Sequence, residues 1–247
     1  FPGVFFFSID TIDLYRPRSS DRTSYAFSRY SRQIKTAETV AMSNISNRKD
    51  DHIQLALQAS HQATTSGGFD RLSFEHSALP QLALSDIDIQ CEFLGLPAAA
   101  PFLIGAMTGG CNNGELINQH LAEAAEHSRI PMALGSQRSA LEQGLAQNVR
   151  RWAPNATILG NLGATQLQQS GLDLAERAVE SVAANALVIH LNPLQELVQP
   201  GGDRDWNYVL EAIETCTSQL SVPVIVKEVG SGTVSYTHLT LPTKRIV

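Results

Sequence analysis

Cysteine is scarce in this sequence of 247 residues, which contains only Cys91, Cys111 and Cys216. Three cysteines so far apart provide neither a disulfide framework nor the close spacing of a zinc site. Long apolar runs are missing as well, because no stretch reaches the length of about 18 residues that a transmembrane helix requires. We therefore expect a cytoplasmic protein without a membrane span.

Basic residues are also few: 18 Lys and Arg stand against 24 Asp and Glu, for a formal net charge of -6. Nucleic acids and anionic membranes select proteins with an excess of Lys and Arg, so neither is an expected partner. The glycine spacing of dinucleotide-binding loops and the Gly-Lys-Ser/Thr ending of a Walker loop are both absent. An anionic small ligand would need a local cluster of cations instead.

Short apolar runs recur along the chain, which is 43% apolar overall, and they are typical of buried strands. Each run is almost uniformly apolar, as expected for a strand buried on both faces of a parallel sheet. Their starts lie about 25 to 36 residues apart, the length of one strand plus one helix. The predicted strands are 102–107, 132–135, 157–160, 186–191 and 222–226.

The segments between these runs show helical spacing of apolar residues, most clearly in 116–124 and 172–182. A further helix is expected from residue 43 to about 57, with a stop at Gly67-Gly68. Alternating strands and helices predict an α/β fold, namely a TIM-type (β/α)8 barrel of which about the first five βα units are present. A doubly wound open sheet is the structural alternative.

Three segments of different character divide the chain. Residues 1–41 precede the first methionine without periodicity, and we interpret them either as upstream translation or as a disordered N-terminal extension. Residues 42–234 carry the incomplete barrel domain. Residues 235–247 interrupt the pattern within an expected turn and resemble a non-native tail, with a genuine loop as the alternative.

A polar or glycine-rich turn follows each predicted strand, at 108–110, 136–138, 161–163, 192–193 and 227–228. Ligands bind at the carboxyl ends of the strands in barrels and open parallel sheets alike, so these turns are expected to meet on one face. In the first turn, Gly109 and Gly110 would let a planar ligand approach the backbone. A tight strand-to-helix connection explains the same glycines equally well.

Lys227 ends an apolar strand, where a cation must face a cleft or pair with an anion because burying it alone is costly. Such a lysine can stabilise the negative charge of a reduced flavin. A salt bridge to Glu228 or Glu196 is the structural alternative.

His190 and Asn192 alternate along a strand end and are expected to face the same side. Gln195 and Glu196 follow in the loop, and Glu196 offers a carboxylate to Mg²⁺, which also accepts phosphate oxygens. The alternative for His190 is a histidine that packs in the core or supports another residue of the site without contacting a ligand.

Arg48 and Lys49 could clamp a diphosphate, although Asp50 and Asp51 favour a solvated, self-neutralised helix end. Arg138, behind another strand end, is a further cation for this task. For residues 201–206 we prefer a structural interpretation, a loop with an aspartate that caps a helix before Trp206.

Taken in order, the motifs from Arg48 to Val234 closely resemble those of the type 2 isopentenyl-diphosphate isomerases. The matching stretches are RKDDHI at 48–53, AMTGG at 106–110, GSQR at 135–138, GNLG at 160–163, HLNPLQE at 190–196, PGGDRDW at 200–206 and PVIVKEVG at 223–230. They cover about three quarters of the chain, and their combined specificity is high.

The resemblance implies interconversion of isopentenyl and dimethylallyl diphosphates, with FMN, Mg²⁺, and NADPH to reduce the flavin. It assigns catalytic roles to His190, Gln195 and Lys227, and the metal to Glu196. FMN contacts would come from Ala106, Met107, Thr108, Ser136, Asn161 and Lys227, and substrate contacts from Arg48, Lys49, Ser136, Arg138, His190, Asn192 and Gln195. A homo-oligomer is expected for the full-length protein.

Barrels of this family continue through three further strands that carry the FMN-phosphate loops, so we expect this chain to be C-terminally truncated and inactive as written. Its fifth strand is expected to be an open, aggregation-prone edge. Two other interpretations stay open, a flavin-dependent 2-hydroxy-acid oxidase on the same barrel and a noncatalytic fragment.

Overall fold

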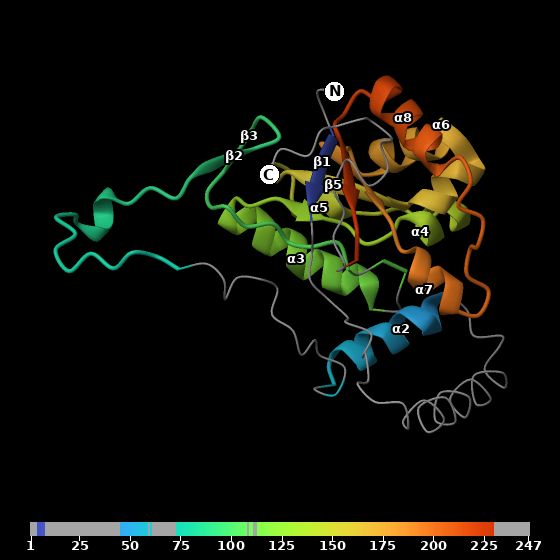
Figure 1. The fold of residues 1–247 in the computed structure, drawn as a ribbon, viewed down its shortest axis with the longest axis horizontal. Coiled ribbons are helices and arrows are strands. Elements are labelled where there is room, and N and C mark those ends of the chain that lie inside the picture. The colour runs from blue at the N-terminus through green and yellow to red at the C-terminus, as the bar shows by residue number, and fades with distance from the viewer. Residues whose placement is uncertain are drawn as a thin grey trace, which may run out of the picture.

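The computed structural model describes residues 4–7, 45–58, 60, 73–107, 109–110 and 113–229. At its centre lies a parallel sheet whose strands follow the order β1-β7-β6-β5-β4 (Figure 1). The strands are β1 (Val4–Phe7), β4 (Met132–Ala133), β5 (Ile158–Gly163), β6 (Ala186–His190) and β7 (Val224–Lys227). From β4 to β7 each strand pairs with the next in the chain, and all of these pairs are parallel.

Helices connect the strands. They are α3 (Gly114–Ser128), α4 (Arg138–Gln143), α5 (Val149–Trp152), α6 (Ala164–Ser181), α7 (Pro193–Val198) and α8 (Val209–Gln219). The helical spacing at 116–124 and 172–182 is confirmed by α3 and α6. Gly171 interrupts α6 with φ 69° and ψ −161°, a conformation that favours glycine. The expected N-terminal helix is α2 (Ile45–Ala56), and its predicted Gly67-Gly68 stop lies outside the described residues.

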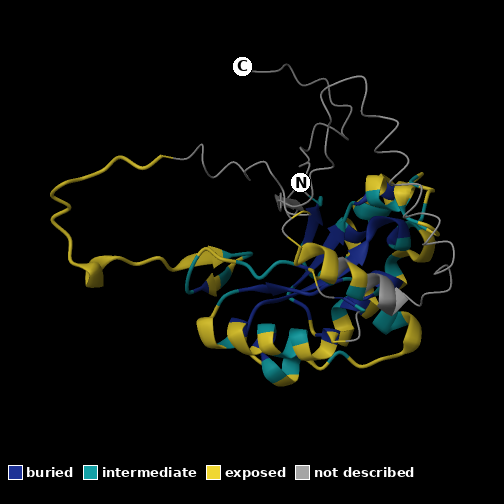
Figure 2. Cartoon of the chain, turned by 90° about the horizontal axis from the view of Figure 1, so that it is seen from below, coloured by how far each residue is buried: buried dark blue, intermediate teal, exposed yellow. Residues whose placement is uncertain are grey.

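The three long helices α3, α6 and α8 all pack on one face of the sheet. Alternation along β5 sends Ile158 and Leu162 to that face, where they join the clusters that contain Ala122 of α3, Ala175 of α6 and Cys216 of α8. The helices bury their inner sides and expose their outer sides (Figure 2). A doubly wound sheet would carry helices on both faces.

The opposite face of the sheet carries a smaller apolar cluster of Ala133, Leu159, Val188 and Ile225 with their neighbours. A two-strand hairpin supplies its cover, because Phe93 and the turn residue Leu94 pack against this cluster. The hairpin consists of β2 (Cys91–Phe93) and β3 (Leu96–Ala98). Before it, a 3₁₀ helix η3 (Leu84–Asp86) lies within an exposed arm of residues 73–90 that extends away from the sheet (Figure 1).

Several expectations differ from the structure. The predicted strand 102–107 is reduced to one bridge between Ile104 and Met132, since its partner β4 is only two residues long and follows Pro131, which has no N–H to donate. The predicted open edge at β7 is wrong, because β1 pairs with it from Val4↔Val224 to Phe7↔Lys227. Residues 4–7 thus form a strand where no strand pattern was expected. Their Val-Phe-Phe-Phe sequence has high β propensity.

The expected aspartate cap before Trp206 is also wrong, because α8 begins three residues later with Tyr208 as its N-cap and no side-chain cap bond. Asp205 instead accepts from the backbone N–H of Asn207 at 3.0 Å, which forms a local turn. Among the described residues, no helix has both the length and the apolar character needed to cross a membrane.

Candidate functional site

A row of polar side chains crosses the carboxyl end of the sheet on the face opposite the helices. The strand register aligns Gly163 with His190 and His190 with Lys227, and Asn161 lies one pleat earlier on the same face of β5. Parallel strands bring their carboxyl ends to one edge, so residues 29 to 66 positions apart in the chain become neighbours. The predicted convergence of β5, β6 and β7 at one edge is therefore observed.

Lys227 is the most deeply buried cation of this row, with a relative exposure of 8%. Desolvation lowers the pKa of its amine from the ordinary value of 10.5, and the nearby charge of Glu228 only partly opposes that shift. The ammonium donates to the backbone carbonyl of Glu228 at 3.3 Å. A buried amine with a lowered pKa is poised to stabilise negative charge or to give up a proton.

An apolar floor lies directly beneath Lys227. The lysine borders a small cavity of about 10 Å³ together with Leu103, Ala106, Ala133, Leu159, Val188 and Ile225. That volume holds no more than one water molecule. Apart from the half-buried Leu103, the apolar residues that line it are almost fully buried.

Asn161 holds His190 in a fixed orientation. The Asn161 Nδ2 group donates to the carbonyl oxygen of Leu134 at 2.8 Å, which leaves Oδ1 directed at Nδ1 of His190 at 2.9 Å. Because Oδ1 can only accept, the network assigns the proton to Nδ1 of His190.

Gln137 is a buried polar residue of this edge to which no separate role was given at the sequence level. Its Oε1 accepts from the backbone N–H of Asn161 at 2.9 Å, and its Nε2 donates to the carbonyl of Ala178 at 3.0 Å. Gly160 makes room for it, because a Cβ there would lie 2.7 Å from Gln137 Oε1. Gln137 belongs to the GSQR motif at 135–138, which pointed to this turn, but no feature of the local sequence indicated that its side chain is buried.

The glycine turn after residue 107 approaches the next turn closely. A Cβ on Gly109 would lie 2.5 Å from the backbone nitrogen of Ser136, so only glycine fits there. Ala106 belongs to the apolar floor, whereas Met107 is 67% exposed. Thr108 lies outside the described residues.

Glu196 lies on α7, just beyond the end of β6, and both of its carboxylate oxygens are engaged. Asn192 donates to Oε1 at 2.8 Å and the backbone N–H of Asp203 donates to Oε2 at 2.9 Å. Asn192 also lies 3.4 Å from Gln195 Oε1, so three of the predicted residues do meet. Within the described part of the chain no cluster of three His, Cys, Asp or Glu side chains could hold a metal ion alone.

A single carboxylate is nevertheless compatible with Mg²⁺. That ion usually keeps several waters and binds through one or two carboxylates plus substrate phosphates. Each oxygen of Glu196 retains a lone pair beyond the bond that it already accepts. Glu196 therefore fits a shared protein–phosphate metal site rather than a dedicated protein cage.

Arg138 faces a different cavity from Lys227. It lies at the start of α4, where Glu142 accepts from its Nε at 2.8 Å and Asp203 from its Nη1 at 3.1 Å. Desolvation opposes its charge, but these two carboxylates outweigh that effect and raise the pKa of Arg138. Its cavity, of about 150 Å³, lies between α4 and α6 and is also bordered by Gln166 and Arg177.

The remaining cations of the prediction belong to α2. Arg48 and Lys49 lie on this helix, which is found at the same end of the sheet as α7 (Figure 1). Their side chains are outside the description, and the clamp that they were predicted to form stays a prediction.

Comparison with known proteins gives a consistent result. No protein-family model matches the chain. It is 52% identical over 194 residues to the isopentenyl-diphosphate delta-isomerase of Cronobacter sakazakii, an alignment that covers 76% of this chain and 56% of that protein. The enzyme of the same name from Xanthobacter autotrophicus is 52% identical over 196 residues, which covers 77% and 57%, respectively.

A more distant relative from Halobacterium salinarum, also named isopentenyl-diphosphate delta-isomerase, is 46% identical over 192 residues, with 75% of this chain and 53% of that protein covered. The chain thus spans little more than half the length of the curated relatives that it matches.

Proposed function

We propose that this chain is part of an isopentenyl-diphosphate delta-isomerase of the FMN-dependent type 2 class, which interconverts isopentenyl and dimethylallyl diphosphates. The observation that carries the proposal is the row of Asn161, His190 and Lys227 at the carboxyl edge of the sheet. It is supported by the 52% identity to enzymes with that activity in their names. We further propose a (β/α)8 barrel for the complete protein, because sequentially paired strands with helices on one face are the winding of that fold.

FMN is compatible in chemical type with the residues around Lys227. The side chains of Ala106, Ala133 and Leu159 form an apolar cluster beside the Lys227 ammonium, and a flavin ring would contact them in place of the hairpin residues Phe93 and Leu94, which cover them here. Gly109 approaches the backbone of Ser136 so closely that a Cβ at this position would not fit. In this proposal the flavin, once reduced by NADPH, supplies a group that accepts and returns a proton without net oxidation.

The side chains of this edge then have distinct tasks. Lys227 lies in a desolvated position, where its positive charge interacts strongly with a negative charge next to it. His190 would keep its Nδ1 proton on Asn161, which fixes the orientation of the imidazole ring at this edge. The apolar floor excludes water from the reacting carbon atoms.

The diphosphate of the substrate would be bound at some distance from these groups. Glu196 would hold Mg²⁺ together with phosphate oxygens, and Asn192, which donates to both Glu196 and Gln195, would keep these two side chains in place. Arg138, with Arg48 and Lys49 of α2, would supply the positive charge that the net composition lacks.

The decisive experiment measures isopentenyl diphosphate turnover with FMN, NADPH and Mg²⁺. It compares the 247-residue chain with a version extended to the length of its relatives by the corresponding segment of the Cronobacter sakazakii enzyme. Turnover in the extended version, reduced about 100-fold or more by Lys227→Met, supports the proposal, because loss of one preorganised charge at a reacting centre has effects of that order.

Arg151→Met, an exchange of an exposed cation on α5, is the matched control and should leave turnover unchanged. An extended protein that binds FMN but oxidises a 2-hydroxy acid instead of isomerising the diphosphate would replace the proposal with the oxidase alternative.

A further inference from the structure

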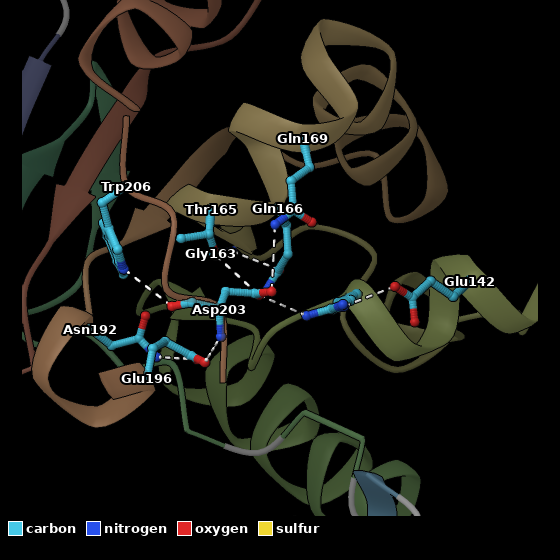
Figure 3. A network of polar contacts seen from close by, with 10 residues as sticks. Glu142, Gly163, Thr165, Gln166, Gln169, Asn192, Glu196, Asp203 and Trp206 are labelled. Carbon is cyan, nitrogen blue, oxygen red and sulfur yellow. Dashed lines mark hydrogen bonds and ion pairs between the residues drawn. The ribbon is translucent and has the colours of Figure 1, made fainter. Parts of the chain in front are cut away.

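Asp203 connects three loops that follow successive strands of the sheet. Its carboxylate accepts from Arg138 behind β4 at 3.1 Å and from the Thr165 hydroxyl behind β5 at 3.3 Å. Its backbone N–H donates to Oε2 of Glu196 behind β6 at 2.9 Å. Figure 3 shows Asp203 at the centre of this network, with Thr165 on one side and Glu196 on the other.

The surrounding chain fixes Asp203 firmly. Trp206 donates its indole N–H to the Asp203 carbonyl at 3.3 Å. Gly202, the preceding residue, lies so close to the Glu196 backbone that a Cβ would overlap the Glu196 carbonyl oxygen. The loop is therefore pressed against α7, and the Asp203 side chain is held only 20% exposed beside Arg138.

We infer that Asp203 is a positioning residue that sets the direction of the Arg138 guanidinium toward the anionic end of a diphosphate ligand. This inference rests on the proposed function, because it assigns Arg138 to the diphosphate. The fork of an arginine binds phosphate oxygens in pairs only when its plane is held in the right orientation. Asp203 holds Nη1, while Glu142 holds Nε from the opposite side.

The test uses inorganic pyrophosphate with Mg²⁺ as the probe and the 247-residue chain as the protein, with binding measured by calorimetry. Asp203→Asn should weaken binding about 10-fold, because small displacements of a positioning contact cost factors of 10 to 100. The Asp203→Asn exchange keeps the backbone N–H on Glu196, so the effect is confined to the carboxylate. Asp205→Asn is the matched control, since Asp205 accepts only within its own turn, from Asn207.

A double-mutant cycle with Arg138→Ala separates positioning from a general structural effect. If Asp203 acts through Arg138, the Arg138→Ala and Arg138→Ala/Asp203→Asn proteins should bind pyrophosphate equally within about twofold. Independent, additive losses would overturn the inference, and so would unchanged or tighter binding by Asp203→Asn. A wild-type chain that binds pyrophosphate no better than Arg138→Ala would overturn it as well.

Thr165→Val provides a second test should Asp203→Asn fail to fold, since it removes the hydroxyl that donates to Asp203 and should weaken pyrophosphate binding in the same direction. In the extended protein, Asp203→Asn should raise KM for isopentenyl diphosphate about 10-fold and leave kcat within about threefold. Absence of turnover in the extended wild type would overturn the proposed function alone, because the pyrophosphate cycle reports on Asp203 independently of chemistry.

Discussion

Nδ1 of His190 lies 2.9 Å from Oδ1 of Asn161, across the boundary between β6 and β5. The same amide donates to the buried carbonyl of Leu134, so one side chain links three consecutive strand ends. Both residues lie on the face of the sheet opposite the long helices, where Asn161 is buried and His190 is half-buried. The amide is therefore both a structural link and the group that fixes the orientation of the His190 ring.

Asn161→Leu should destabilise the chain, because it removes the donor to the Leu134 carbonyl without changing the volume much. A buried carbonyl left unsatisfied costs about 1–3 kcal/mol, and urea denaturation should show a loss of unfolding free energy of that size. Asn207→Leu, at an exposed turn, is the control and should change the unfolding free energy by less than about 0.5 kcal/mol. Equal losses in both variants would contradict the role given to Asn161.

The sequence predicted the regular parts of this fold well. Uniformly apolar runs gave β5, β6 and β7 to within a few residues, because strands buried on both faces have that local pattern. From the parallel order alone it followed that Asn161, His190 and Lys227 would share one edge.

Long-range polar contacts could not be predicted in the same way. Asp203 has the local pattern of a turn or cap, yet its charged partner Arg138 lies 65 residues away in the chain. Gln137 likewise contacts Ala178 across 41 residues. Such pairs depend on the paths of loops and on how helices pack, and no short sequence window contains that information.

Arg150 illustrates a contact of this kind with a measurable consequence. Its guanidinium donates to the carbonyls of Ala156 at 2.7 Å, Ala183 at 2.6 Å and Val182 at 3.1 Å, and to Oδ1 of Asn185 at 2.8 Å. Arg150→Met should lower the unfolding free energy by about 2–4 kcal/mol, because a single hydrogen bond to a charged group contributes about 1.5–3 kcal/mol.

The neighbouring Arg151 is exposed and serves as a matched control, so Arg151→Met should stay within about 0.5 kcal/mol of the wild type in the same urea titration. Similar losses at both positions would show that charge on α5, rather than the carbonyl contacts of Arg150, stabilises this corner.

Gly160→Ala should be destabilising for a steric reason that can be isolated. The new methyl group would lie 2.7 Å from Oε1 of Gln137 and 3.3 Å from Leu187, and overpacking of this kind costs about 1–3 kcal/mol. In a Gln137→Ala background most of that cost should vanish, because the nearest atom is gone. A cost that persists there would identify the backbone of β5 as the source instead.

The two described cysteines should differ sharply in reactivity. Cys91 is exposed, whereas Cys216 is 1% exposed and burial raises the pKa of its thiol to about 11. Iodoacetamide at neutral pH should label Cys91 within minutes and spare Cys216, because only the thiolate reacts. Peptide mapping by mass spectrometry separates the sites, and prompt labelling of native Cys216 would contradict the packing of α8 against the sheet.

Lys227 should make stability depend on pH with a defined sign. Desolvation lowers its pKa in the folded chain below the ordinary 10.5, so the unfolded chain binds more protons between these two values and stability rises with pH across that window. Lys227→Met removes the buried charge, so the variant should unfold at a higher temperature than the wild type at neutral pH. For a chain of this size, each 1 kcal/mol added to the unfolding free energy raises the unfolding temperature by about 2–4 °C.

The gain from Lys227→Met should shrink as the pH rises from the lowered pKa of the folded chain toward 10.5, because the folded wild-type amine is then already neutral. The thiol of Cys216 acts in the opposite direction between its ordinary pKa of 9.0 and about 11, because the folded chain retains that proton longer and stability falls. Thermal unfolding from pH 7 to 10.5 is therefore best compared in a Cys216→Ala background, which removes the contribution of this thiol. A gain that stays constant with pH would show that the methionine stabilises by packing alone, and that Lys227 carries no desolvation penalty.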